Sequence, residues 1–318
     1  MNTMKNIDLD TRLLELFCCV YEKGSISKSS NCLHLSQSTI SFHINQLEKS
    51  IGLKLFYRKG RTLIPTSNAH ILYPYAKKIL EIKILALEEI KLISGSYKGH
   101  IRIGASSIPG TYLLPDIVSN YLNKNPNSSI EIIVEDSMKV VNMVEDGKVD
   151  VGFIGFRCVN PDFEVIQMWE DTIHFVGSKN IQRNLSLTDL VKYPFILREE
   201  SSGTRKFVEN LLRAKGIELR DLNVIAVVDK NDIIISLLKK VQAVSFISSY
   251  AIRGKKDINV LKIKDLEPIK RSFYLIYDRE RPQSPAVRLF LDMTLKACPG
   301  GLEPPTLGFG NPRSIHLS

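Results

Sequence analysis

The feature that most constrains the fold is a change in the spacing of apolar residues near residue 95. Over residues 8–95 the apolar positions recur at helical spacing almost throughout, whereas residues 99–296 alternate strand-like and helix-like segments. The join at residues 94–99 consists of glycine, serine, tyrosine and lysine, and small-residue stretches of this kind are typical of domain boundaries. We therefore expect a helical N-terminal part followed by an α/β part.

Composition narrows the class of protein. The chain has 318 residues, 44% hydrophobic and 24% charged, which are ordinary values for a globular protein of two or three domains. Its five cysteines form no C-x-x-C motif, which argues against a disulfide framework and a structural zinc site. Without an apolar leader or a membrane-length apolar run, we expect a cytoplasmic protein with no membrane partner. The net charge of +9 is a mild indication of a polyanionic partner.

Three amphipathic helical segments are expected between residues 9 and 50. The second begins after Ser25 and the third after Ser36, and serine is a favoured N-cap residue. A tight turn at residues 33–36 joins these two segments, which is the helix-turn-helix pattern. Periodicity alone is equally compatible with a generic helical bundle.

The third helix favours DNA binding over the generic bundle. With its apolar residues turned inward, its outer face carries small hydroxyl, amide and aromatic side chains and almost no acids. Such side chains suit a surface that meets phosphates and base edges. Residues 55–66 then predict a two-stranded wing that turns at Gly60, with basic residues at its tip placed for backbone phosphates.

These residues resemble the LysR-type transcriptional regulators. The match runs through residues 13–17, 22–27, 33–41, 47–48, 51–52 and 55–58 and continues to about residue 296. The resemblance implies a winged helix-turn-helix domain at 9–66, a linker and dimerisation helix at 67–95, and an effector-binding domain at 99–296. That last domain would have two α/β lobes, as in bacterial periplasmic solute-binding proteins. Residues 297–318, rich in proline and glycine, are expected to form a disordered tail.

The resemblance also implies partners and DNA contacts. The partners would be double-stranded operator DNA with an interrupted palindrome, a small effector, and further copies of the chain in a homodimer or a dimer of dimers. The residues expected to contact DNA are Ser27, Gln37, Ser38, Thr39, Ser41, Phe42, His43, Arg58, Arg61 and Thr66.

Two hydroxyl-rich motifs in the α/β part predict an effector site. Residues 104–110 and 198–205 each follow a strand and open a helix, so hydroxyls and free backbone N–H groups would face one cleft. Ordinary helix capping is the alternative explanation. The expected ligand is a small anion, and the expected contacts are Ser106, Ser107, Phe156, Ser202, Gly203 and Thr204. Runs 104–115, 198–205 and 270–277 look closest to a LysR subgroup linked to sulfur assimilation or selenium metabolism.

Enzymatic functions find no support in the motifs. The sequence has no G-x-S-x-G, P-loop or HExxH motif, and its histidines lack metal-ligand spacing. We expect a ligand-responsive transcriptional regulator with no catalytic residues, cofactor or metal. Two alternatives stay open: a degenerate regulator without effector sensing, and a solute-binding protein without a nucleic-acid role.

Overall fold

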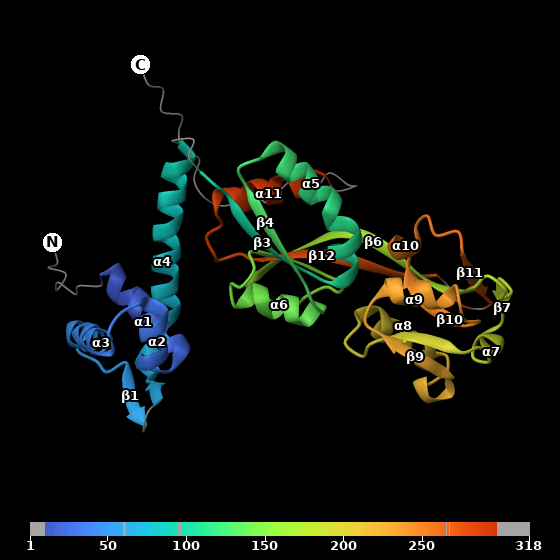
Figure 1. The fold of residues 1–318 in the computed structure, drawn as a ribbon, viewed down its shortest axis with the longest axis horizontal. Helices are drawn as coiled ribbons and strands as arrows, with labels where there is room; N and C mark the ends of the chain where they lie inside the picture. The colour runs from blue at the N-terminus through green and yellow to red at the C-terminus, as the bar shows by residue number, and fades with distance from the viewer. Residues whose placement is uncertain (1–9, 60–61, 94–96, 265, 267, 298–318) are drawn as a thin grey trace, which may run out of the picture. The chain divides into compact units, whose positions relative to one another are not determined.

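The computed structural model describes residues 10–59, 62–93, 97–264, 266 and 268–297. The chain divides into two compact units, Met1–Tyr97 and Lys98–Ser318. The first is helical apart from one hairpin, and the second is α/β, as the change in periodicity predicts (Figure 1). The disordered tail expected at residues 297–318 lies outside the described residues except for Ala297, which is the C-cap of α11 (Pro285–Lys296).

The N-terminal unit is a winged helix-turn-helix with a long final helix. Asp10, Ser25 and Ser36 cap the first three helices, and Gly24 ends the first with a positive φ of 59°. The fully buried residues Leu14, Phe17, Ile40 and Leu47 hold these helices together. The elements are α1 (Thr11–Lys23), α2 (Ile26–Leu33), α3 (Gln37–Ile51), β1 (Phe56–Lys59), β2 (Thr62–Pro65) and α4 (Ser67–Ile93).

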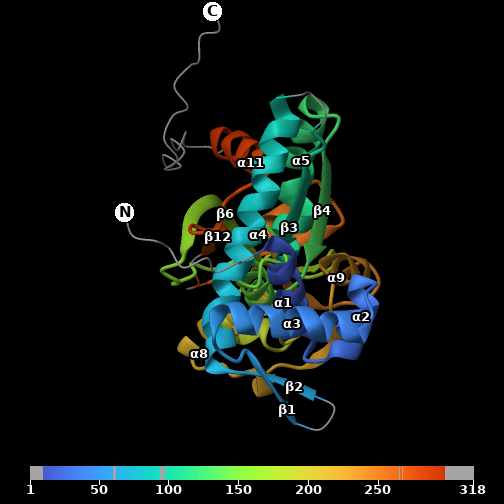
Figure 2. The same cartoon turned by 90° about the vertical axis from the view of Figure 1, so that its left-hand side faces the viewer.

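The second unit is built on one continuous sheet shared by two lobes (Figure 1), and Figure 2 shows strands β3 and β4 of the first lobe side by side. Its strand order is β4-β3-β5-β12-β6-β10-β8-β9. The first three strands pair in parallel, as do the last three, and each set belongs to one lobe. The strands of the first lobe are β3 (His100–Ala105), β4 (Ser129–Val134) and β5 (Val151–Ile154), and those of the second are β8 (Phe195–Arg198), β9 (Val224–Val228) and β10 (Val244–Ser248).

Two long antiparallel strands, β6 (Phe163–Ser178) and β12 (Ile269–Asp278), connect the lobes. Helices cover each lobe: α6 packs on β3, β5 and β12, while α8 and α9 pack on β8 and β10. The remaining elements of this unit are a wide helical turn (Pro109–Leu113), α5 (Leu114–Lys124), α6 (Ser137–Glu145), β7 (Asn184–Leu185), α7 (Leu187–Leu190), α8 (Gly203–Ala214), a short 3₁₀ turn (Leu219–Asp221), α9 (Asn231–Leu238), α10 (Ser249–Ile252), β11 (Ile258–Ile263) and α11 (Pro285–Lys296).

Crossing a bilayer requires a helix of about 20 mostly apolar residues. Within the described ranges, no helix combines the length and the apolar character that crossing a membrane would need.

Candidate effector pocket and DNA-binding surface

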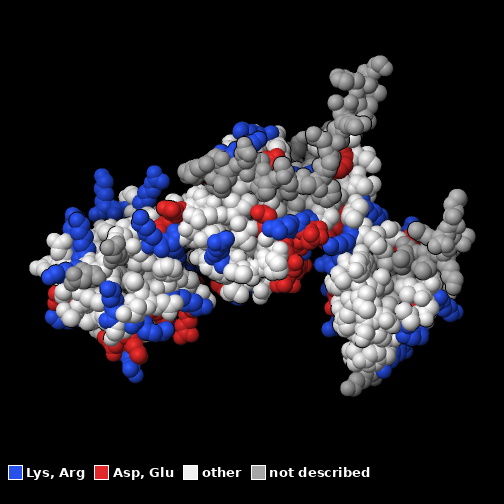
Figure 3. Space-filling model, turned by 180° about the vertical axis from the view of Figure 1, so that it is seen from behind, with Lys and Arg blue, Asp and Glu red and all other residues white. Residues whose placement is uncertain are grey.

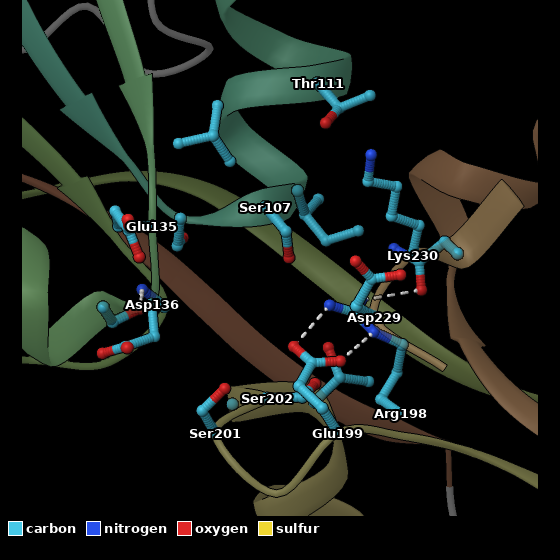
Figure 4. Close-up of a pocket in the computed structure, with 18 of the residues that line it drawn as sticks. Ser107, Thr111, Glu135, Asp136, Arg198, Glu199, Ser201, Ser202, Asp229 and Lys230 are labelled. Carbon is cyan, nitrogen blue, oxygen red and sulfur yellow. Dashed lines mark hydrogen bonds and ion pairs between the residues drawn. The ribbon is translucent and has the colours of Figure 1, made fainter. Parts of the chain in front are cut away.

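A pocket of about 660 Å³ lies between the two lobes of the second unit. Its lining includes five of the six predicted effector contacts: Ser106, Ser107, Ser202, Gly203 and Thr204. They come from the two predicted motifs, one after β3 and the other at the beginning of α8. Figure 4 shows Ser107 between Glu135 and Asp136 on one side and Arg198, Asp229 and Lys230 on the other.

The local fold explains why these hydroxyls face the cleft. Strand β3 ends at Ala105, and the Ser106 N–H donates to the Phe153 carbonyl at 2.7 Å. In the other lobe Ser202 is the N-cap of α8, and its Oγ accepts from the Arg205 N–H at 3.4 Å. Capping uses one lone pair of Ser202, so its O–H stays free to donate. The capping explanation and the binding explanation are therefore compatible at this residue.

Ser106 carries an unsatisfied polar atom. The residue is only 8% exposed, and its Oγ is buried with no hydrogen-bond partner in the described part of the chain. Leaving a buried hydroxyl unpaired costs about 1–3 kcal/mol, so native proteins rarely do it without a reason. A ligand in the pocket could supply the missing partner.

Phe156 does not line the pocket. It follows β5 as predicted, but its side chain is 38% exposed and Gly155 takes the lining position instead. The arginines of the second motif are also committed to internal contacts. Arg205 donates from Nη1 to the Arg198 carbonyl at 2.8 Å and pairs with Glu209.

The pocket contains a buried ion pair that motif reasoning missed. Arg271 of β12 lines the pocket, and its Nε donates to Asp171 Oδ2 of β6 at 2.8 Å. Its Nη1 donates to Thr204 Oγ1 at 2.9 Å. Burial lowers the pKa of Arg271 and the Asp171 carboxylate opposes that shift, but an arginine stays protonated in proteins. The permanent positive charge of Arg271 therefore lies directly behind Thr204, which is one of the predicted effector contacts.

Arg198 is a second buried cation of the pocket. It is 3% exposed and forms a two-point contact with Glu199, from Nε and Nη2 at 2.8 Å each. Its Nη1 also donates to Asn231 Oδ1 at 3.2 Å. Nearby, burial raises the pKa of the Tyr112 phenol to about 12, and the negative charge of Asp232 adds to this shift. The phenol therefore stays neutral and can donate a hydrogen bond.

In the N-terminal unit, α3 presents the outer face that the helical spacing predicts. Ile40, Ile44 and Leu47 are buried, whereas Phe42 is 64% exposed. Around it, Gln37 and Ser38 are exposed, while Thr39, Ser41 and His43 are half-buried. Phe42 is thus an exposed aromatic side chain among polar neighbours on the outer face of α3.

Several predicted DNA contacts also have structural hydrogen bonds. The Ser36 Oγ lies 2.8 Å from Ser38 Oγ and 2.7 Å from Thr39 Oγ1, and His43 Nδ1 lies 3.3 Å from Gln46 Oε1. Each hydroxyl keeps further hydrogen-bonding capacity beyond that contact. Ser27 is exposed in the first turn of α2.

The structure describes two of the three DNA contacts predicted for the wing and the residue after it. Arg58 is exposed on β1, whereas Arg61 lies outside the described residues. Thr66 is half-buried, and its Oγ1 donates to the Lys54 carbonyl at 2.8 Å and accepts from the Ala69 N–H at 3.3 Å. Thr66 thus fastens the wing to the start of α4. Figure 3 shows a broad uncharged face on this unit, bordered by lysine and arginine side chains.

Neither unit offers a metal centre in its described part. Across the residues with assigned positions, no three or more histidine, cysteine, aspartate or glutamate side chains come together in a way that could hold an ion.

Comparisons with known proteins identify the family of both units. Residues 11–70 match the bacterial regulatory helix-turn-helix protein, lysR family, and residues 94–299 match the LysR substrate binding domain. The helix-turn-helix match speaks against a solute-binding protein without a nucleic-acid role. The HTH-type transcriptional regulator MJ0300 of Methanocaldococcus jannaschii is 30% identical over 290 residues, covering 89% of this chain and 97% of that protein. YeiE of Escherichia coli is 31% identical, over 88% of this chain and 95% of that protein.

Solved structures share the fold at lower identity. CbnR complexed with its target DNA aligns with a TM-score of 0.57 and 20% identity, over 90% of this chain and 99% of that one. The CcmR regulatory domain of Synechocystis in complex with 2-PG gives a TM-score of 0.57 and 19% identity, over 64% of this chain and 98% of that one. With two family matches that together span both units, the chain belongs to the LysR family: it is a DNA-binding transcriptional regulator with an effector-binding domain, and not an enzyme.

Proposed function

We propose that this regulator is controlled by a small anionic effector bound in the pocket between the two lobes. The observation that carries the proposal is the unpartnered Ser106 Oγ, buried at the point where the two hydroxyl motifs face each other. Ser107, Ser202 and Thr204 add O–H donors, and Arg271 places a positive charge behind Thr204. Hydrogen bonds to an ionised acceptor are the strong ones, so this arrangement favours an anion.

The proposed effectors are an inorganic oxyanion or the carboxylate of a sulfur or selenium metabolite. Supporting this choice, runs 104–115, 198–205 and 270–277 resemble a subgroup associated with sulfur assimilation or selenium metabolism. The first two runs include pocket residues, and the third includes Arg271. That a domain of this fold was solved with a small molecule, 2-PG, fits an effector of modest size.

The proposed DNA contacts lie on α3 and the wing. Gln37, Ser38, Thr39, Ser41, Phe42 and His43 would enter or border the major groove, with Ser27, Arg58, Arg61 and Thr66 on the flanking backbone. The operator would be an interrupted palindrome read by two copies of the chain. CbnR, which has the same fold, was solved with its target DNA.

Self-association in the cytoplasm would proceed through α4, the proposed linker within residues 67–95. Its exposed side chains include Ile71, Tyr75, Ile82 and Ile90, at 55–64% exposure. These positions recur at helical spacing and form a stripe that a second copy could cover. Either a homodimer or a dimer of dimers would result.

Calorimetry on the full chain tests the effector proposal. Sulfate, selenite and O-acetylserine would be titrated into the wild type, into the double variant S202A/T204A, and into Ser236→Ala as a control. Ser236 is exposed on α9 of the same lobe, and it does not line the pocket. We expect the double variant to bind its anion at least about tenfold more weakly, the equivalent of one lost charge-assisted bond.

Two results would contradict the proposal. Equal binding by the wild type and the double variant would place the site elsewhere. No binding of any anion by the wild type would favour a degenerate regulator without effector sensing. Footprinting on the upstream region of the gene, with and without the anion, would connect binding to DNA occupancy.

A further inference from the structure

The pocket is much larger than an inorganic oxyanion requires. Its volume of about 660 Å³ lies within the range of about 300–1,000 Å³ that organic ligands occupy. A water molecule, by comparison, takes up about 30 Å³ of liquid volume. The pocket therefore has room for an organic molecule with more than one polar end.

The charges that line the pocket are of both signs, with acids in excess. Its basic residues are Lys139, Arg198, Lys230 and Arg271, and its acidic residues are Glu135, Asp136, Glu199, Asp229 and Asp232. Five acids against four bases give the lining a slight excess of negative charge, which favours a ligand that carries a positive charge as well as an anionic group. The anion-binding hydroxyls thus share the pocket with a surplus of carboxylates.

Internal pairing shows which carboxylates already have a cationic partner. Glu199 is held by Arg198, and Lys139 lies 2.9 Å from Glu135 and 3.5 Å from Asp136. Arg271 is balanced by Asp171 behind the pocket.

Asp229 and Asp232 differ from these pairs. Asp232 accepts only a long bond of 3.5 Å from the Tyr112 hydroxyl, and Asp229 has no ion pair or hydrogen bond in the described part of the chain. Both are exposed: Asp229 lies just before α9 and Asp232 lies in its first turn, with the lining residue Lys230 between them in the sequence. Two carboxylates with one neighbouring cation leave room for a second positive charge.

We infer that the effector is a zwitterion, whose anionic group bonds to the hydroxyls of Ser106, Ser107, Ser202 and Thr204 and whose ammonium group bonds to Asp229 and Asp232. The inference rests on the proposed function, because it assigns a chemical class to the same pocket. Two independent features support it: the buried Ser106 hydroxyl has no hydrogen-bond partner among the described residues, and Asp229 and Asp232 line the same pocket without an ion pair there. An amino-bearing carboxylate satisfies both at once.

Calorimetry on the full chain, with matched pairs of compounds, tests whether the effector is a zwitterion. The probes are the standard amino acids, O-acetylserine, β-alanine and 4-aminobutyrate, each beside its N-acetyl form, together with sulfate and selenite. N-acetylation keeps the carboxylate and removes the ammonium charge. We expect at least one amino-bearing probe to bind, and its N-acetyl form to bind about tenfold or more weakly, as for loss of one charged contact.

Variants place the ammonium group. In D229N/D232N the parent compound and its N-acetyl form should bind equally, whereas Glu200→Gln should keep the wild-type preference because Glu200 is exposed and outside the lining. Melting curves establish that each variant folds, and Asp229→Asn alone serves if the double variant does not.

Each other outcome overturns part of the argument. The placement of the ammonium group is overturned if D229N/D232N still prefers the amino-bearing compound to its N-acetyl form. It is also overturned if only E135Q/D136N removes that preference. An oxyanion or N-acetyl compound that binds as tightly as any zwitterion, and is lost in S202A/T204A, overturns the zwitterion and upholds the anionic effector. Absence of binding by every probe overturns both.

Discussion

Buried serine hydroxyls in this regulator serve two different ends. Ser29 of α2 is completely buried, and its Oγ donates to the Ser25 carbonyl at 2.9 Å and lies 3.4 Å from the Cys19 carbonyl. Ser106 is buried to a similar degree, but its Oγ has no partner among the described residues. A satisfied hydroxyl stabilises the fold by about 1 kcal/mol, whereas an unsatisfied one costs free energy until a ligand binds.

Alanine at these two positions should therefore change stability in opposite directions. We expect Ser29→Ala to lower the free energy of unfolding by about 0.5–1.5 kcal/mol, and Ser106→Ala to raise it by up to about 1 kcal/mol without ligand. Ser106→Ala should also weaken effector binding. Urea denaturation measures both changes, and a destabilised Ser106→Ala variant would mean that its hydroxyl is already satisfied.

Phe42 offers a test of base recognition on α3. Its exposed ring has no polar group, so its expected use is contact with a thymine methyl in the major groove. We predict that Phe42→Ala lowers discrimination at one base pair per half-site by about 1–3 kcal/mol. Competition binding with singly substituted operators measures this, and the idea fails if the variant ranks all sites as the wild type does.

At the scale of elements, the short buried strands could be predicted from sequence, whereas the long inter-lobe strand β6 could not. β3, β8 and β10 are short runs in which most residues are buried, so apolar residues mark them in the sequence. The sequence does not predict β6, because polar residues interrupt the run of apolar residues where the strand passes between the lobes. Asp171 looks wrong for a buried strand until its cross-strand partner is known, and that partner, Arg271, is 100 residues away.

Separation along the sequence also explains why some pocket residues could be predicted and others could not. Hydroxyls at a strand-to-helix junction have a local signature, so both motifs were recognised from sequence. Arg271 has none, because only the register of β6 and β12 brings it beneath Thr204. The buried and exposed positions just after β5 are too few to form a pattern. The sequence therefore could not show that Gly155 lines the pocket and Phe156 does not.

The Asp171–Arg271 pair should be costly to break on one side. Asp171→Ala leaves a buried guanidinium without its counter-charge, so we expect a loss of about 3–5 kcal/mol in stability. Replacing both residues, as in D171L/R271M, should cost clearly less. Thermal unfolding measures these changes beside Asp257→Ala, which breaks the exposed pair with Lys239 and should cost about 1 kcal/mol or less. A double variant as unstable as the single one would refute the argument.

The wing supplies charge and not sequence readout in our proposal. Arg58 is exposed on β1, where it can reach a phosphate. We predict that Arg58→Ala weakens binding to specific and random DNA by similar factors and lowers the slope of log K against log salt by about one unit. A loss confined to the specific operator would instead place Arg58 on a base edge, and a lowered melting temperature would show that it anchors the wing.

At the scale of the whole molecule, the two units differ in how fully each one buries its own apolar surface. The second unit buries its core on both sides of a shared sheet. The N-terminal unit ends in a helix of 27 residues that leaves much of its apolar surface exposed. Exposed apolar stripes of this length mark surfaces for association, so oligomerisation is expected to be a property of α4.

The final prediction concerns this stripe. Ile82 and Ile90 are 55% and 62% exposed, so I82E/I90E should leave the monomer folded while placing charges within the expected α4 contact. We expect sedimentation velocity to show a smaller species than the wild type, together with weaker binding to a two-half-site operator and little change on a single half-site. Leu53→Glu provides the control, because Leu53 is an equally exposed apolar residue (51%) of the same unit outside α4. If both variants sediment as the wild type does, α4 is not the interface, and the pairing of reading heads must arise from the second unit.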